Sequence, residues 1–133
     1  MAAPLYDPAL TPDTLWQASL AIYAEPDMQK TLLARQDQQG LNVNLELLRL
    51  HLERAGTPLD TAWYAQLQTA IAPFNAHFTQ RLRALRQTFA SSTELPPESR
   101  QQLKQQLLAA ELTLESEEQA RLVRAYHQLG QSL

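Results

Sequence analysis

Apolar residues recur at helical spacing in the first half of the chain and divide it into three short segments. The first begins at Thr11-Pro12, where a hydroxyl N-cap and a proline at the first helical position are typical of a helix start. It ends before Pro26, and the second segment runs from about Pro26 to Gln39, just before Gly40. The third runs from about Val43 to Ala55 and is followed by another glycine. Because glycine commonly ends helices, the pattern predicts three helices joined by short turns.

The third of these segments is apolar on two sides. One face carries four leucines, at positions 41, 45, 48 and 52, and Val43, Leu47 and Leu50 lie on a roughly opposite face. A helix with two apolar faces is normally covered by other elements on both sides. We therefore predict that this segment is the central helix of the fold.

The second half of the chain contains two longer apolar stripes. One extends from about Thr61 to Ala90, and because Pro73 lacks an amide hydrogen we expect a kink or a break there. Residues 91–97 form the clearest loop, and a final helix is predicted from about Pro97 to Leu129. The residues predicted to lie in the core are Trp16, Leu33, Leu45, Leu48, Phe74, Phe78, Leu107 and Leu114.

Together these segments predict an all-α protein, a single-domain bundle of about five helices whose last two are long and antiparallel. A chain of 133 residues accommodates one hydrophobic core. Its 3 glycines and its abundance of leucine, alanine and glutamine favour helix over sheet. We expect residues 1–10 to form an irregular N-terminal arm, since Pro4 and Pro8 cannot donate backbone hydrogen bonds, and residues 11–133 to form the helical domain.

The composition of the chain argues against several classes of function. The net charge of -3 lacks the basic signature of nucleic-acid binding. With no cysteine, the chain cannot form disulfides, thiolate metal sites or a cysteine nucleophile. The first ten residues lack the charged and apolar regions of a signal peptide, and no apolar run approaches the ~18 residues of a membrane span. We therefore expect a cytoplasmic protein that binds neither nucleic acid nor membranes.

A polar cluster surrounds the predicted turn at Gly40. The cluster consists of Gln36, Asp37, Asn42, Asn44 and His51, and all of these except Asn42 are candidate binding residues, with Trp16 and Tyr23 expected at its flank. Asn44 and His51 lie between the two apolar faces of the central helix, so both should be partly buried and hydrogen-bonded. One interpretation is that the polar residues cap helix ends and hold the turn. The alternative is a binding or catalytic pocket in which Asp37 and His51 form an acid–base pair.

The last helix carries carboxylates on its apolar side, at Glu111 and Glu118. We expect no metal site, because no glutamate is followed three residues later by histidine and the 3 histidines are far apart in sequence. Buried charges are usually paired, which predicts structural ion pairs with arginines of the preceding helix. If the hairpin turn centres near Glu94, Glu111 contacts Arg81 or His77.

Several short motifs in the first half of the chain resemble those of a known family. They are Leu15-Trp16, Tyr23-Ala24 with Pro26, Gln36-Asp37 with Gly40, and Val43-Asn44 before the leucines at 47 and 48. In this order they are similar to the signature of a small proteobacterial family of unknown function, Leu-Trp … Tyr-Ala-x-Pro … Gln-Asp-x-x-Gly-x-x-Val-Asn. The resemblance implies a helical bacterial protein and implies no particular reaction.

No catalytic motif stands out, since the chain has neither a Gly-x-Ser-x-Gly elbow nor a glycine-rich phosphate loop. We therefore expect no cofactor and favour a non-catalytic helical interaction or regulatory module. Its partner would be another protein or a second copy of the chain, with Leu5-Tyr6 as an exposed contact. The alternative is a small-molecule-binding or catalytic bundle that uses Asp37, Asn44 and His51. A deep pocket beside Trp16 would favour the alternative, and a large flat apolar patch would favour the module.

Overall fold

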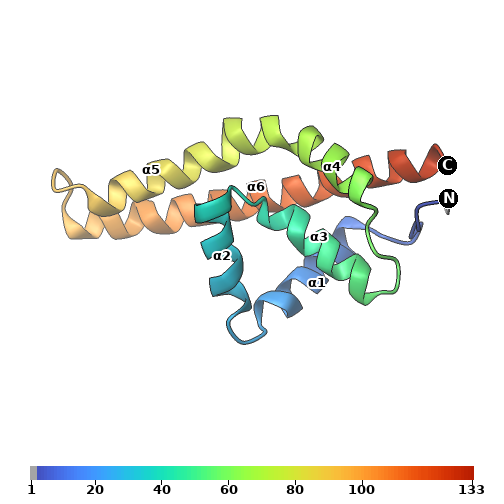
Figure 1. The fold of residues 1–133 in the computed structure, drawn as a ribbon. Helices are drawn as coiled ribbons and strands as arrows, with labels where there is room; N and C mark the ends of the chain where they lie inside the picture. The colour runs from blue at the N-terminus through green and yellow to red at the C-terminus, as the bar shows by residue number, and fades with distance from the viewer. Residues whose placement is uncertain (1–2) are drawn as a thin grey trace.

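The computed structural model describes residues 3–133, of which 78% are helical, and this part of the chain contains no strand (Figure 1). The elements are α1 (Pro12–Tyr23), α2 (Met28–Gln39), α3 (Val43–Arg54), α4 (Thr61–Phe74), the π-helical turn η1 (Asn75–Thr79), α5 (Gln80–Ser91) and α6 (Pro97–Gln131). The predicted all-α fold is therefore confirmed, including the long final helix. None of the helices in the described part combines the length and apolarity that a bilayer crossing requires.

The elements α4, η1 and α5 follow one another without a break and form one long rod that runs antiparallel to α6. The rod bends near its middle, where Pro73 precedes the π-turn (Figure 1). A proline inside a helix removes one backbone hydrogen bond, and a wider turn accommodates the change. The kink predicted at Pro73 thus takes the form of a π-turn.

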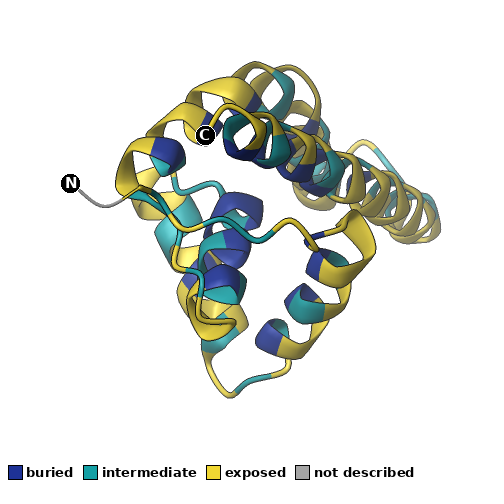
Figure 2. Cartoon of the chain, turned by 90° about the vertical axis from the view of Figure 1, so that its right-hand side faces the viewer, coloured by how far each residue is buried: buried dark blue, intermediate teal, exposed yellow. Residues whose placement is uncertain are grey.

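The short helices α1, α2 and α3 cover only part of this hairpin, and the end near the α5–α6 loop extends beyond them (Figure 1). Figure 2 shows that buried residues concentrate where the short helices meet α6 and α4, whereas α5 contains no buried residue. Six residues of α3 are buried, which agrees with its predicted central position. The body of the protein is thus at one end of the hairpin, close to both termini.

The hydrophobic core joins α1, α3, α4 and α6. Leu45 and Leu48 are fully buried as predicted, and Trp63 and Tyr126 pack against each other beside them. Four more predicted core residues are only partly buried, namely Trp16, Phe74, Leu107 and Leu114. The prediction was wrong for Leu33, which is 41% exposed, and for Phe78, which is 53% exposed.

Both errors have a local cause. On α2 the neighbouring Leu32 points inward and packs with Ile22 and Leu47, which turns Leu33 outward. On the long rod, Trp63, Leu67, Ile71 and Thr79 are buried and Asn75 is half-buried, so the inward-facing positions follow a four-residue spacing. The π-turn has more residues per turn than an α-helix, so it continues this spacing and leaves Phe78 on the outer side.

The N-terminal segment packs against the end of α6. The Tyr6 hydroxyl lies 2.6 Å from His127 Nδ1, and His127 Nε2 donates to the Leu10 carbonyl at 2.6 Å. Because Nε2 carries the proton in that bond, Nδ1 of the neutral ring accepts from Tyr6. The Tyr6 ring also covers Gly130 so closely that a Cβ at this position would overlap it. Gly130 therefore permits this close approach. Leu5 and Tyr6 were predicted to form an exposed contact with a partner, but only Leu5 is exposed, because Tyr6 packs against α6.

Candidate functional site

A cavity of about 420 Å³ lies where the three short helices meet the α5–α6 hairpin. Its wall includes residues of α1, α2, α3, η1, α5 and α6, so segments far apart in sequence form it together. Small-molecule sites in proteins commonly measure roughly 300–1,000 Å³, and the cavity falls in this range. Its wall combines charged and amide side chains with leucines and two aromatic rings.

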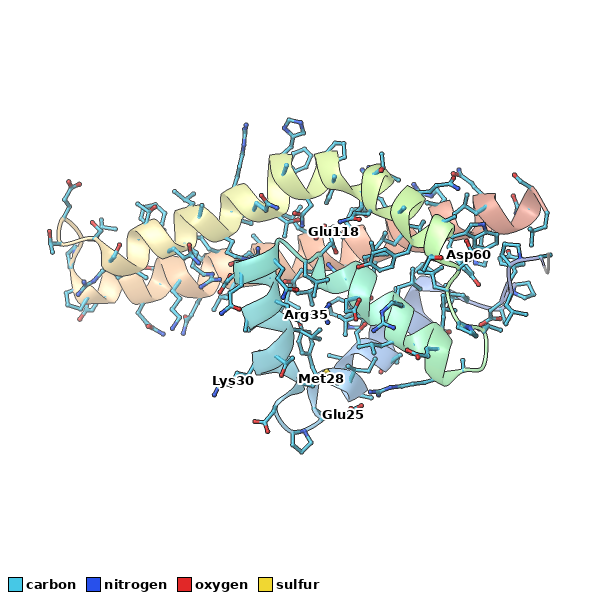
Figure 3. All side chains as sticks on the ribbon, viewed as in Figure 1. Glu25, Met28, Lys30, Arg35, Asp60 and Glu118 are labelled. Carbon is cyan, nitrogen blue, oxygen red and sulfur yellow. The ribbon has the colours of Figure 1, made fainter. Side chains whose placement is uncertain are left out.

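The most buried polar group of the wall is the Glu118 carboxylate, which is 1% exposed. Figure 3 shows Glu118 on α6, near the turn that leads into α3. One oxygen accepts from Asn42 Nδ2 at 3.3 Å and Asn75 Nδ2 at 2.8 Å. The other accepts from Asn44 Nδ2 at 3.2 Å and Thr79 Oγ1 at 3.1 Å. Four uncharged donors, and no cation among residues 3–133, therefore hold this carboxylate.

Local structure places each of these donors. Gly40 ends α2 with a φ of 67°, which turns the chain back so that Asn42 becomes the N-cap of α3. The Asn42 side-chain oxygen caps Leu45 N–H at 3.0 Å, which leaves its amide nitrogen free to donate to Glu118. Asn75 and Thr79 lie at the two ends of the π-turn, and its geometry directs both towards α6. The helix end and the π-turn thus meet at one carboxylate.

Next to Glu118 on α6, Gln119 is a buried amide with only half of its hydrogen bonds formed. Its Nε2 donates to Ser19 Oγ at 3.0 Å and to Asn44 Oδ1 at 3.1 Å. Its Oε1 is buried and has no partner among the described residues. Buried amide oxygens are nearly always paired, so this acceptor marks a position where a donor is missing.

Glu111 forms the clearest ion pair of the wall, with Arg86. The Arg86 Nε donates to one carboxylate oxygen at 2.6 Å and its Nη2 donates to the other at 3.2 Å. The predicted contact of Glu111 with Arg81 or His77 is therefore wrong, and both of those residues are exposed. The reason is the register of the hairpin.

The hydrogen-bonded pairs between the two long helices show this register. Those that join Glu118 to η1 and Glu111 to α5 place the centre of the hairpin near Pro97, not near the loop residue Glu94. A later centre moves residues of α5 by about two helical turns relative to α6, which brings Arg86 to Glu111.

The third carboxylate of the wall, Glu115, differs from the other two because it makes no hydrogen bond or ion pair with any of residues 3–133. Burial raises the pKa of its carboxyl above the ordinary value, with a partly opposing effect from Arg83. Across the cavity wall, burial together with the negative charge of Glu115 raises the pKa of Tyr23 to about 12. Tyr23 therefore keeps its proton at physiological pH, and its hydroxyl also lacks a partner in the described part of the chain.

Both arginines of the wall already have hydrogen-bond partners. Arg86 is held by Glu111, and both terminal nitrogens of Arg83 donate to the Gln36 oxygen at 2.5 and 2.7 Å when that amide faces the guanidinium. Gln36 thus joins α2 to α5 across the cavity. Neither arginine of the wall therefore forms an ion pair with Glu115, whose carboxylate is left as an acceptor without a donor in the described part of the chain.

The mouth of the cavity is apolar. Four leucines that line it are exposed to solvent, Leu20, Leu33, Leu108 and Leu112. Trp16 and Tyr23 stand beside them on α1. Single exposed leucines are common on protein surfaces, but several around one opening are typical of ligand-binding sites.

The structure separates the predicted site residues into two groups. Trp16, Tyr23, Gln36 and Asn44 all line the cavity. Asp37 is exposed and lies at a shallow surface depression beside Gly40, and His51 is half-buried further along α3 and takes no part in the wall. Among residues 3–133, no hydrogen bond joins Asp37 to His51, so the acid–base pair of the alternative hypothesis is not formed.

Several residues of the wall and of the hydrogen-bond network around Glu118 could not be assigned from the sequence. Asn75, Thr79 and Gln119 approach Glu118 and Asn44 only through the π-turn and the long-range packing of α6. One signal was present, because positions 75 and 79 continue the four-residue spacing of Trp63, Leu67 and Ile71. Among residues 3–133, no group of three or more histidine, aspartate or glutamate side chains is arranged to hold a metal ion.

The chain is thus a small all-helical protein with a cavity whose wall is partly polar and partly apolar. The chain belongs to the family described as "Protein of unknown function (DUF2390)", whose model matches residues 14–122. This range includes every residue that lines the cavity, and the match confirms the resemblance to a family of unknown function. No curated protein and no solved structure matches the chain.

Proposed function

We propose that the protein binds a small amphipathic molecule in the cavity between the short helices and the α5–α6 hairpin. This corresponds to the binding form of the alternative hypothesis, with Asn44 retained and with neighbouring wall residues in place of Asp37 and His51. The observation that carries the proposal is a cavity of about 420 Å³ beside Trp16 with buried, incompletely paired polar groups inside and exposed leucines at its mouth.

Two physical arguments support it. Buried polar groups without partners lower stability, so their presence in a wall is easiest to explain if a ligand completes their hydrogen bonds. Exposed leucines around an opening gain free energy when an apolar group covers them, at about 25 cal/mol per Å² of buried apolar surface. A molecule with a polar head and an apolar tail satisfies both parts of the wall.

The test blocks the mouth and measures binding of the neutral fluorescent dye Nile red. Leu20→Trp introduces a larger, aromatic side chain at the mouth. The position is already 51% exposed, so the core is left intact. Leu85→Trp is the matched control, because Leu85 is also half-exposed but does not line the cavity. We expect Nile red to bind the unmodified chain and the control, and to bind Leu20→Trp at least tenfold more weakly. Absence of dye binding, or equal binding to all three, would contradict the proposal.

A second candidate function is the helical interaction module, and a groove that adjoins the cavity and shares Leu112 with it supports this function. Phe78 and Leu112 are half-exposed on either side of this shallow groove of about 720 Å³ that also includes Phe74 and Arg121. Its partner would be another protein or a second copy of the chain. Sedimentation of the full chain against Phe78→Ser tests self-association. A dimer that the substitution dissociates would support this candidate, and a monomer at every concentration would exclude the homodimer.

A further inference from the structure

Two hydrogen-bond acceptors of the cavity wall have no donor among residues 3–133. Of the three carboxylates in its wall, Glu111 is satisfied by Arg86 and Glu118 by four neutral donors. Glu115 has no partner among residues 3–133. The Gln119 oxygen is a second acceptor without a partner, in a residue that is only 2% exposed.

These two acceptors lie close together. Glu115 and Gln119 are four residues apart on α6, which places them on the same face of the helix, about 6 Å apart along its axis. Both residues line the cavity. The Gln119 oxygen has almost no accessible surface, so a ligand in the cavity reaches the Glu115 carboxylate, and an ammonium or a guanidinium could donate to it.

The charge of the wall indicates the sign of that group. Glu111, Glu115 and Glu118 face Arg83 and Arg86, which leaves one negative charge in excess when all are ionised. The two arginines are already engaged, Arg86 by Glu111 and Arg83 by Gln36. An anionic ligand would thus meet excess negative charge and occupied cations, whereas a cation would meet an unpaired carboxylate.

We infer that the ligand is an amphipathic amine, whose positively charged head is bound by Glu115 and whose apolar tail lies along the leucines of the mouth. The inference rests on the proposed ligand-binding function and specifies its chemical class. Trp16 and Tyr23 also line the cavity, and aromatic faces favour cations.

The experiment compares three probes with the same eight-carbon tail: n-octylammonium, n-octanol and octanoate. Each displaces Nile red from the full chain at pH 7.5. We expect n-octylammonium to bind about tenfold or more tightly than n-octanol, because a buried charge-assisted hydrogen bond commonly has an effect of this size, and octanoate to bind most weakly. Equal affinities for the ammonium and the alcohol would overturn the inference.

Two glutamine variants of α6 identify the residue responsible. Glu115→Gln keeps the size of the side chain and removes its charge, so the preference for n-octylammonium over n-octanol should disappear. Glu117→Gln is the control, since Glu117 pairs with Arg121 at the surface and does not line the cavity, and it should keep the preference. A preference that survives in Glu115→Gln would overturn the assignment. Failure of Nile red to bind the unmodified chain would instead overturn the proposed function, and the inference with it.

Discussion

Replacing Glu118 by glutamine tests the polar network that holds the wall of the cavity together. The change keeps the shape of the side chain but converts one acceptor oxygen into an NH₂ group, which then faces two donors. The asparagines cannot simply turn their amides to accommodate it. Each already uses its oxygen as an acceptor, Asn42 for Leu45 N–H, Asn44 for Gln119 and Asn75 for Gln80.

The Thr79 hydroxyl can rotate to accept from the new NH₂ group, whereas Asn44 Nδ2 cannot, so the expected cost follows from one lost hydrogen bond and from the weakening of the others when the acceptor loses its charge. A hydrogen bond to a charged group contributes about 1.5–3 kcal/mol, and removal of a buried charge offsets part of the loss. We therefore expect Glu118→Gln to lower the free energy of unfolding by about 2–4 kcal/mol.

Urea denaturation followed by circular dichroism at pH 7 measures this difference. Glu117→Gln is the matched control on the adjacent, half-exposed position, and it should change stability by no more than about 0.5 kcal/mol. If Glu118→Gln were as stable as the control, the carboxylate would not be the acceptor of four structural hydrogen bonds.

Three further predictions concern other parts of the fold. Glu111→Ala should destabilise by about 1–3 kcal/mol in urea denaturation, because it leaves the partly buried Arg86 without its partner; no change would refute the pairing. Gly130→Ala should destabilise by about 1–3 kcal/mol through overlap with the Tyr6 ring, and should be neutral or stabilising in a Tyr6→Ala background; an equal cost in both would refute the contact. Glu115→Gln should be more stable than the unmodified chain at neutral pH, since burial raises the folded-state pKa of Glu115 and its ionised form is unfavourable. That advantage should be complete above the raised pKa and disappear as the pH falls below the ordinary value of 4.5, and an advantage independent of pH would contradict the assignment.

The elements that could be predicted from the sequence are those with a local physical signal. Thr11 caps α1, with its hydroxyl accepting from Thr14 N–H at 3.1 Å, and Pro12 occupies the first helical position as expected. Gly40 ends α2 in the left-handed conformation because only glycine adopts it without strain. The two apolar faces of α3 correctly indicated that it would be covered on both sides.

The register of the long hairpin could not be predicted in the same way. It depends on the π-turn after Pro73 and on the path of the loop, and neither leaves a strong periodic signal. This uncertainty led to the wrong partner for Glu111 and to the placement of Phe78 in the core. Glu118 was expected to pair with an arginine because buried charges usually do, but neutral amides satisfy it instead.

The sequence predicts only part of the cavity wall. Trp16, Tyr23, Gln36 and Asn44 were grouped through their positions on the first three helices, and all four line the cavity. The contribution of α6 required long-range contacts that sequence spacing does not contain. Glu115 in particular becomes a candidate ligand-binding residue only because the structure shows that its carboxylate has no partner among residues 3–133.

The most direct test of ligand binding uses the two tryptophans of the chain as reporters. Trp16 lines the cavity, whereas Trp63 is buried in the core against Tyr126 and does not line it. In a proton–nitrogen correlation spectrum each indole N–H gives its own signal, and the full chain is titrated with n-octylammonium. We predict that the Trp16 signal shifts in a saturable manner and that the Trp63 signal stays nearly constant. A constant Trp16 signal throughout the titration, or equal shifts of both signals, would contradict binding of the amine in the cavity.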